Sequence, residues 1–356
     1  MYTRPTAVAD EAVREALRAR WGFDAVSITY EPVGFGSYHW RATGVDGTEL
    51  FVTVDDLRKN CRDAHDTTGA FGRLRRAFAT ARALYDQARL RFVVAPLPDR
   101  DGSTIWRLHE RYSLVVHPFM SGRPAGDHGE FRSTADRDGV IDRLVELHRA
   151  TPVAGPHASR EDAFLPNRDG LELALQQLGR PWQTGPYGER ARAALASHAP
   201  EVERLLEAYD RLARGAVRDE ARWVITHGEP DAGNVLIGED GPLLVDWESA
   251  LIAPPERDLW SLRSGDGSVI DRYSATSGTV VLPEVLDFYR LWYDLFEIGG
   301  YLSLFRGRHA EDADSAESWK NLVHFLRPAD RWPALLTELG APVTRGRRSS
   351  RGRPAP

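Results

Sequence analysis

Alternating and helical spacings of apolar residues divide the chain into two parts of different character. In the first part, residues 26–40 have the pattern of strand, glycine turn and strand, and residues 49–55, 91–96 and 113–117 have the pattern of three further strands. Residues 69–89 instead place apolar side chains at helical spacing, which predicts a helix. The first part is therefore predicted to form a five-stranded, mainly antiparallel sheet with one interposed helix.

Helical spacing dominates the second part, which begins after a segment rich in glycine and proline at residues 120–127. We expect an N-terminal lobe over residues 1–117 and a larger helical lobe over residues 118–343, so the fold class is α+β. The basic, low-complexity tail at residues 344–356 is predicted to be disordered. The predicted helices of the second lobe cover residues 135–150, 170–178, 189–214, 256–262, 283–305 and 313–326.

The most informative segment is residues 224–259, which has the pattern of a strand, a polar loop, a strand, a tight turn and a third strand. Polar side chains gather where these strands end, with Glu229 and Asn234 on the loop and Asp246 after the hairpin. Phosphoryl transfer needs these residue types, because a carboxylate must face the attacking hydroxyl while an acid and an amide oxygen hold magnesium on the phosphates. The segment therefore indicates phosphoryl transfer.

Three short motifs in this segment carry a resemblance to a known family. Residues 227–234 read His-Gly-Glu-Pro-Asp-Ala-Gly-Asn, residues 245–248 read Val-Asp-Trp-Glu, and residues 254–259 read Pro-Pro-Glu-Arg-Asp-Leu. In these motifs and their order the sequence resembles the aminoglycoside phosphotransferases, choline kinases and related small-molecule kinases. The resemblance implies a two-lobed protein-kinase-like fold, in which an antiparallel-sheet N-lobe binds ATP or GTP with Mg²⁺ and a mainly helical C-lobe holds the acceptor.

The resemblance also implies roles for individual residues of these motifs. Asn234 and Asp246 would bind magnesium, and Asp258 would cap or brace the helix that it opens. The family usually has aspartate at the position of the catalytic base, where this chain has Glu229, and commonly has histidine where this chain has Asp231. Either carboxylate can serve as the base, and the register with Asn234 favours Glu229.

Two segments at the edges of the predicted sheet are candidates for the nucleotide site. Gly34, Gly36 and Ser37 join the first two strands, where glycines let backbone amides approach phosphate and the serine hydroxyl adds a donor. Phe119 and Met120 follow the last strand, at the hinge that the resemblance implies. Apolar side chains at this hinge can sandwich the base of a nucleotide.

The nucleotide-binding lysine of the resembled family is missing from the third predicted strand, where Thr53 takes its place. The following helix has no acidic residue over residues 69–83, so both halves of the family's ion pair are absent together. Another cation must then offset the phosphate charge. The candidates are Lys59, which precedes that helix, and three arginines on the helix, namely Arg73, Arg75 and Arg76.

Composition narrows the expected partners and location. A net charge of −6 gives no basic field for nucleic acid, and no run of about 18 apolar residues is present to span a membrane. Cys61 is the only cysteine, which excludes a disulfide within the chain and fits a reducing cytoplasm. We therefore expect a cytoplasmic enzyme with a small-molecule partner, and nothing in the sequence indicates an oligomeric state.

The acceptor site is expected between the predicted helices of residues 135–214 and 283–305. These helices carry acids such as Glu297 and aromatic residues such as Tyr301. The resemblance predicts that the acceptor is an antibiotic of the aminoglycoside, aminocyclitol or nucleoside type, and that its phosphorylation gives resistance or self-protection.

The alternative from another class is a nucleotide-binding pseudokinase that acts as a regulator. Thr53, Glu229 and Asp231 favour this alternative, because each departs from the pattern of the resembled family. Asn234 and Asp246 favour catalysis, because a chain that no longer transfers phosphate has no need of a magnesium pair.

Overall fold

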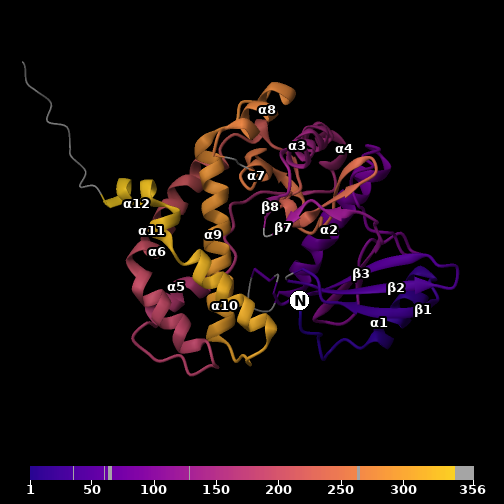
Figure 1. Cartoon of the computed structure of the whole chain (residues 1–356), viewed down its shortest axis with the longest axis horizontal. Coiled ribbons are helices and arrows are strands. Elements are labelled where there is room, and N and C mark those ends of the chain that lie inside the picture. The colour runs from indigo at the N-terminus through magenta and orange to yellow at the C-terminus, as the bar shows by residue number, and fades with distance from the viewer. Residues whose placement is uncertain (35, 60, 63–65, 128, 263–264, 341–356) are drawn as a thin grey trace, which may run out of the picture.

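The computed structural model describes residues 1–34, 36–59, 61–62, 66–127, 129–262 and 265–340, and these residues form two lobes (Figure 1). The sheet of the first lobe lies at one side of the molecule, and the long helices of the second lobe lie at the other. The predicted lobe boundary at residues 117 and 118 stays a prediction, and the tail at residues 344–356 lies outside the described residues. Within the described ranges, no helix combines the length and the apolar character needed to cross a membrane.

The first lobe is built on a five-stranded sheet in which every neighbouring pair of strands is antiparallel. Its elements are α1 (Asp10–Ala16), a π-helical turn (Leu17–Trp21), β1 (Ala25–Glu31), β2 (Tyr38–Gly44), β3 (Glu49–Asp56), β4 (Trp106–Arg107) and β5 (Tyr112–Pro118). The strand order is β1-β2-β3-β5-β4. Side chains alternate between the two faces, so Leu50, Val52 and Val54 of β3 share one face, which packs in a core with α1.

Residues 91–96 do not form the predicted strand, and the fifth strand of the sheet is β4 instead. Phe92 and Val93 are buried in a core that belongs mainly to the second lobe. The backbone of this segment bonds to a hairpin of that lobe, because the amide of Leu244 donates to the carbonyl of Phe92 at 2.7 Å and the amide of Val94 donates to the carbonyl of Leu244 at 3.0 Å. A buried apolar run has the composition of a central strand, which explains the wrong prediction.

Helix α2 (Thr67–Asp86) packs on the other face of the sheet. Asp66 caps the start of this helix by accepting a hydrogen bond from the amide of Gly69 at 2.7 Å. Leu74 and Phe78 bury their side chains in a cluster with Val115 of β5. The helix therefore braces the face of the sheet that looks toward the second lobe.

The second lobe consists mainly of helices around two apolar cores, with short strands between them. Its helices are α3 (Thr134–Arg149), α4 (Thr151–Ala154), α5 (Arg168–Gln176), α6 (Gly188–Ala216), α7 (Glu256–Leu259), α8 (Ser268–Ser277), α9 (Pro283–Arg306), α10 (Ala313–Phe325), α11 (Pro328–Arg331) and α12 (Pro333–Gly340), with 3₁₀ turns at Glu220–Arg222 and Ala232–Asn234. Its strands are β6 (Arg123–Pro124), β7 (Gly126–Asp127), β8 (Glu130–Phe131), β9 (Ser159–Arg160), β10 (Val224–Thr226), β11 (Val235–Gly238), β12 (Gly241–Leu244) and β13 (Leu251–Ala253).

The predicted hairpin of the second lobe is present as β11 and β12. β6 extends it to three strands in the order β12-β11-β6, and a second small sheet has the order β10-β13-β9. One apolar core lies against the hairpin and contains the fully buried Trp247. The other core lies between α5, α6 and α9. These helices support the side of the space between the lobes that lies opposite the sheet.

Two histidines of the first lobe, the half-buried His39 and the buried His117, lie on the face of the sheet that looks toward the second lobe. His39 of β2 stacks on Phe51 with ring centroids 5.0 Å apart, and His117 of β5 lies edge-on to Phe78 with centroids 6.1 Å apart. Burial lowers the pKa of His39 from 6.5 to about 3 and the pKa of His117 from 6.5 to about 4. Both imidazoles are therefore neutral in the native protein at neutral pH.

We predict that His39 and His117 lower the free energy of unfolding as the pH falls from about 6.5 to about 4, against the opposite effect of the cavity carboxylates whose pKa values burial raises. In this range the unfolded chain binds protons on these two histidines and the native chain does not, so acid favours unfolding by up to about 1.4 kcal/mol per pH unit for each group. Urea denaturation across this pH range measures the slope. The variant His117→Leu should lose the part of this pH dependence that His117 contributes. The variant His109→Gln, at an exposed position, should keep the full dependence. An unchanged slope in His117→Leu would contradict the prediction.

Candidate active site

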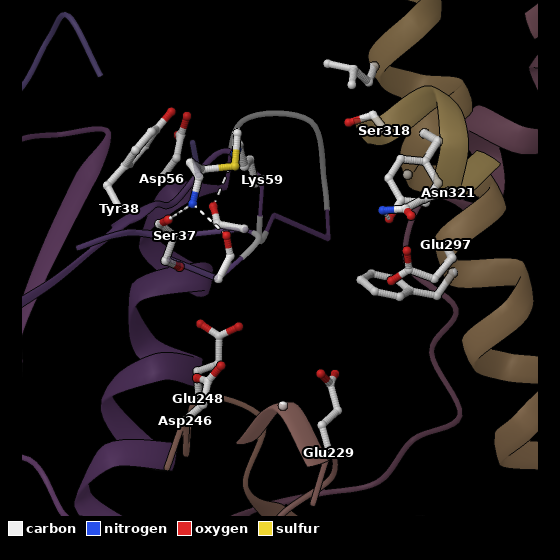
Figure 2. A pocket seen from close by; sticks show the side chains of 18 of the residues that line it. Ser37, Tyr38, Asp56, Lys59, Glu229, Asp246, Glu248, Glu297, Ser318 and Asn321 are labelled. Atoms are coloured by element: carbon white, nitrogen blue, oxygen red, sulfur yellow. Dashed lines mark hydrogen bonds between the residues drawn. The ribbon is translucent and has the colours of Figure 1, made fainter. Parts of the chain in front are cut away.

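A cavity of about 2800 Å³ lies between the lobes and brings together the site residues that the sequence predicts (Figure 2). These residues come from the loop before β2, from β3, from the connection after β5, and from the segment between β10 and α7. Their individual roles stay predictions. The predicted residues on the cavity wall are Gly34, Gly36, Ser37, Thr53, Phe119, Met120, Glu229, Asp231, Asn234 and Asp246.

The loop that carries Glu229 is held at its start by the carboxylate of Asp258. This carboxylate accepts hydrogen bonds from the amides of His227 at 2.9 Å and Gly228 at 2.6 Å, and from Nε2 of His148 at 3.0 Å. Burial opposes its ionisation, but the hydrogen bond from His148 and nearby positive charge keep the pKa of Asp258 below its usual value. The expectation that Asp258 caps its own helix is wrong, because its oxygens face the loop instead.

The side chain of His227 ties this loop to the hairpin that follows. Its Nε2 donates to the carbonyl of Val245 at 2.8 Å, and its ring lies edge-on to Trp247 with centroids 4.6 Å apart. Burial lowers the pKa of His227 to about 4, so the ring is neutral and its Nδ1 can accept. The amide of Glu229 donates to that Nδ1 at 3.3 Å, which further restrains the loop.

The β11–β12 hairpin brings Asn234 and Asp246 close together. The amide of Val245 donates to the carbonyl of Asn234 at 3.0 Å, so Asp246 directly follows the residue that pairs with Asn234. Nδ2 of Asn234 donates to the carbonyl of Glu229 at 3.0 Å, which leaves the side-chain oxygen of Asn234 available as an acceptor. Asp246 has a φ of 64°, a left-handed conformation that is uncommon for residues other than glycine and recurs at functional sites.

Glu229 and Asp231 lie in different environments. The carboxylate of Asp231 caps the 3₁₀ turn Ala232–Asn234 by accepting a hydrogen bond from the amide of Gly233 at 2.8 Å. The carboxylate of Glu229 points into the cavity and makes no hydrogen bond to any part of the chain that the structure describes (Figure 2). Burial, together with repulsion from Asp246 and Asp231, raises the pKa of Glu229 to about 8.

Further carboxylates crowd around Asp246. Burial and repulsion from Asp231 raise the pKa of Asp246 to about 6, and burial and repulsion from Asp246 raise the pKa of Asp55 to about 6. The pKa of Glu248 is also raised by burial and by Asp246. Asp55 was not predicted as a site residue, although the alternation of β3 places it on the same face as Thr53. This concentration of negative charge favours the binding of a cation.

The donor chemistry of Asn234 and Asp246 suits magnesium. A side-chain amide oxygen and a carboxylate are the hard oxygen ligands that Mg²⁺ prefers. Magnesium is commonly held by one or two protein carboxylates together with substrate phosphates and water. The pair therefore fits an ion that a nucleotide would share through its phosphates.

The glycine loop before β2 lies at the edge of the cavity. Gly34 and Gly36 have φ angles of 67° and 111°, which glycine adopts without the strain that a side chain would add. The hydroxyl of Ser37 donates to the carboxylate of Asp55 at 2.6 Å. A phosphate that approached Ser37 would therefore compete with Asp55 for this proton.

The residues that line the cavity show which of the candidate cations could replace the missing lysine. Thr53 at the expected lysine position is neutral, and its hydroxyl lies 3.3 Å from Nδ1 of His39. The arginines of α2 are not among the described residues that line the cavity, and Arg76 donates to the hydroxyl of Ser159 at 2.8 Å. Lys59 does line it.

Helices α9 and α10 form a polar part of the cavity wall. Glu297 and Asn321 project from this wall into the same space that Glu229 enters (Figure 2). Asn321 donates from its amide to the hydroxyl of Tyr301 at 3.2 Å, and burial raises the pKa of Glu297. The acceptor candidates Glu297 and Tyr301 thus lie side by side, while the residues of α10 were not predicted.

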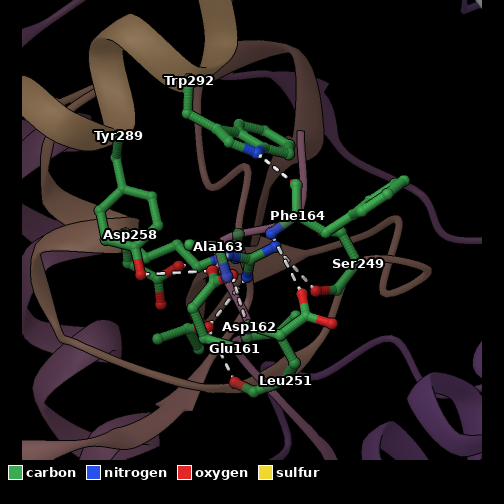
Figure 3. Close-up of polar contacts among 12 residues, drawn as sticks. Glu161, Asp162, Ala163, Phe164, Ser249, Leu251, Asp258, Tyr289 and Trp292 are labelled. Atoms are coloured by element: carbon green, nitrogen blue, oxygen red, sulfur yellow. Dashed lines mark hydrogen bonds and ion pairs between the residues drawn. The ribbon is translucent and has the colours of Figure 1, made fainter. Parts of the chain in front are cut away.

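A segment after β9 lines another side of the cavity, and Figure 3 shows polar contacts that hold it. The carboxylate of Glu161 holds the segment by accepting hydrogen bonds from the amide of Asp162 at 3.0 Å and from the hydroxyl of Tyr289 at 3.3 Å. Arg62 of the first lobe forms an ion pair with Asp162, and its guanidinium lies 4.4 Å from the centre of the Phe164 ring. These contacts join the loop after β3 to the second lobe.

Comparisons with known sequences agree with this arrangement. A family model described as the phosphotransferase enzyme family matches residues 34–292, which is more than half of the chain. Protein StrN of Streptomyces griseus is 31% identical over 245 residues, which cover 66% of this chain and 72% of that protein.

Solved structures are similar over nearly the whole chain. A spectinomycin phosphotransferase in complex with ADP and spectinomycin has a TM-score of 0.67 at 16% identity and covers 90% of this chain and 98% of its own. An amicoumacin kinase in complex with AMP-PNP and Ca²⁺ has a TM-score of 0.56 at 12% identity, covering 91% and 94%. Choline kinase LicA from Streptococcus pneumoniae has a TM-score of 0.52 at 13% identity, covering 89% and 98%.

These similarities confirm the two-lobed protein-kinase-like fold that the sequence predicts. The family match spans the glycine loop, the loop that carries Glu229, the hairpin and the first part of α9. The chain belongs to the phosphotransferase enzyme family.

Proposed function

We propose that this protein is a Mg²⁺-dependent kinase that moves the γ-phosphate of ATP or GTP to a hydroxyl of a small molecule. The observation that carries the proposal is that one cavity is lined by the glycine loop, by Asn234 and Asp246, and by the carboxylate of Glu229. Phosphoryl transfer is catalysed mainly by positioning and by stabilisation of charge, and these groups supply both. Membership of the phosphotransferase family supports the same type of reaction.

The phosphate chain would lie between the glycine loop and the end of the hairpin. The amides near Gly34 and Gly36 would approach the phosphates, while Asn234 and Asp246 would hold magnesium against them. When bound, the ion offsets the negative charge of the transferred group. The complexes of the spectinomycin phosphotransferase with ADP and of the amicoumacin kinase with AMP-PNP and Ca²⁺ support the use of a nucleotide and a divalent cation.

Glu229 is the proposed base. A base must reach the hydroxyl proton of the acceptor by a hydrogen bond, so its carboxylate has to be accessible from the cavity. Glu229 meets this condition, whereas the carboxylate of Asp231 is used to cap the turn that leads to Asn234. Glu229 would therefore accept or orient the proton, and Asp231 would hold the loop in shape.

The wall opposite the sheet supports a cationic acceptor. Glu297 and Asp169 line this part of the cavity together with the aromatic ring of Tyr293. Carboxylates attract amino groups, and aromatic faces pack against apolar ring faces. We therefore propose an aminoglycoside or aminocyclitol antibiotic as the acceptor, with a nucleoside antibiotic as a further member of the same panel and resistance or self-protection as the biological role.

We predict that Asn234→Ala and Asp246→Asn each lower the rate of phosphate transfer by about a hundredfold or more, because each removes a magnesium ligand. Asparagine is chosen at position 246 because it tolerates a left-handed backbone. The substitution therefore removes the carboxylate and leaves the fold intact. The rate is measured as ADP release with Mg²⁺ and ATP or GTP across a panel of aminoglycoside, aminocyclitol and nucleoside antibiotics. Thermal unfolding checks that both variants remain folded.

Two outcomes would contradict this proposal. A wild-type protein that binds nucleotide but phosphorylates no acceptor of a broad panel would favour the pseudokinase. Variants at Asn234 and Asp246 that retain the wild-type rate would remove these residues from the proposed magnesium site.

We also predict that Glu229→Gln lowers kcat by about 10²- to 10⁴-fold, whereas Asp231→Asn lowers it by less than about tenfold. Each substitution replaces one carboxyl group of the same loop by an amide of the same size, so the two variants are chemically matched. Asparagine at position 231 can still accept the hydrogen bond from Gly233. Steady-state kinetics of both variants make the comparison, and the reverse order would move the base to Asp231.

A further inference from the structure

Lys59 is a cation of the cavity wall to which the family's motifs give no role. It follows β3 and lines the cavity beside the glycine loop. Its Nζ donates to the carbonyl of Gly36 at 3.1 Å, lies 3.7 Å from the sulfur of Met1, and lies 5.5 Å from the centre of the Tyr38 ring. An ammonium group has three donors, so these contacts leave at least one donor for a ligand.

Lys59 lies at the end of the cavity where negative charge is concentrated. Asp55 interacts electrostatically with both Lys59 and Asp246, so Lys59 and the proposed magnesium ligand are neighbours of the same carboxylate. A triphosphate bound at this end would add more negative charge beside Asp55, Asp246 and Glu248. A positive side chain is therefore needed there, and the neutral Thr53 cannot provide it.

Two other cations on the cavity wall, Arg111 and Arg62, are already held by carboxylates. Arg111 binds Asp56 through Nε and Nη2, with the shortest distance at 2.5 Å, and Arg62 pairs with Asp162. No carboxylate oxygen of the described residues lies within 4.0 Å of Nζ of Lys59, so none of them forms an ion pair with it. Asp56, Asp314 and Asp55 interact with Lys59 at longer range. Of these cations, Lys59 is the one that a phosphate can engage without breaking an ion pair.

We propose that Lys59 binds the phosphate chain of the nucleotide, so that the positive charge absent from β3 is supplied by the connection that follows it. This inference rests on the proposed kinase function. The hydrogen bond to Gly36 sets the direction of the lysine, because it holds the ammonium group against the loop whose amides would approach the same phosphates. Partial burial lowers the pKa of Lys59, and an adjacent phosphate would favour its charged form.

The chain offers a sharp test because Lys59 and Lys320 are its only lysines. We would acetylate the full-length protein with an amine-reactive reagent and measure the modification of each lysine by mass spectrometry. Mg²⁺–ATP should slow the modification of Lys59 by about tenfold or more, and adenosine should not. Lys320, which lies on the α10 wall of the same cavity with its Nζ 2.7 Å from Glu317, is the internal reference, and Mg²⁺–ATP should slow its modification far less than that of Lys59.

Binding measurements on variants provide an independent readout. Lys59→Met should raise the Kd for Mg²⁺–ATP by about tenfold to a hundredfold, because it removes a charge-assisted hydrogen bond to phosphate, while the Kd for adenosine stays the same. Lys59→Arg should recover most of the affinity. The matched control is Arg75→Met, which removes one positive charge from an exposed position on α2 that does not line the cavity, and it should bind like wild type. Isothermal titration calorimetry measures the Kd of each protein for Mg²⁺–ATP and for adenosine.

The outcomes separate this inference from the proposed function. If wild type binds Mg²⁺–ATP but Lys59 is not protected and Lys59→Met binds equally well, Lys59 is not a phosphate ligand and the kinase proposal stands. The same conclusion follows if Arg58→Met, at the neighbouring position on the cavity wall, loses affinity and Lys59→Met does not. If wild type binds no nucleotide, the proposed function fails and this inference fails with it.

Discussion

The position of one buried carboxylate, that of Asp258, determines where the residues of the proposed active site can lie. It holds two successive amides at the end of β10, and a side chain at Gly228 would come within 2.5 Å of Arg257, so the backbone has one course through this point. The loop then presents Glu229 and enters the 3₁₀ turn that ends at Asn234. Without the carboxylate, the buried donors would lose their partners at a cost of about 1–3 kcal/mol each.

The free site also contains unfavourable interactions that ligand binding can relieve. Asp246 keeps a left-handed backbone, which costs on the order of 1–3 kcal/mol, and burial together with repulsion among neighbouring carboxylates raises the pKa values of Asp246, Glu229 and Glu248. The surrounding hydrogen bonds of the loop and hairpin keep these groups in place despite their repulsion. In the proposed function, magnesium and Lys59 would relieve this repulsion, so the free protein is already arranged for a cation and an anion together.

Much of this arrangement could be predicted from the sequence, because local patterns specify local structure. The alternation in residues 49–55 predicted β3, and the turn signal predicted the hairpin that brings the two proposed magnesium ligands together. Contacts between distant segments could not be predicted in this way. Residues 91–96 bond to that hairpin rather than to the sheet, and Asp258 faces a loop rather than its own helix. The different surroundings of Glu229 and Asp231 likewise depend on a cap that exists only in the folded chain.

The proposed acceptor wall is carried by α9 and α10, whereas the groups proposed for phosphate transfer are carried by the first lobe and by the loop and hairpin before α7. Side chains on the cavity face of these two helices can therefore change without moving the backbone that holds Asn234 and Asp246. Such a division makes the protein modular in an evolutionary sense. A lineage can acquire a new substrate by drift in two helices while it inherits an unaltered reaction centre.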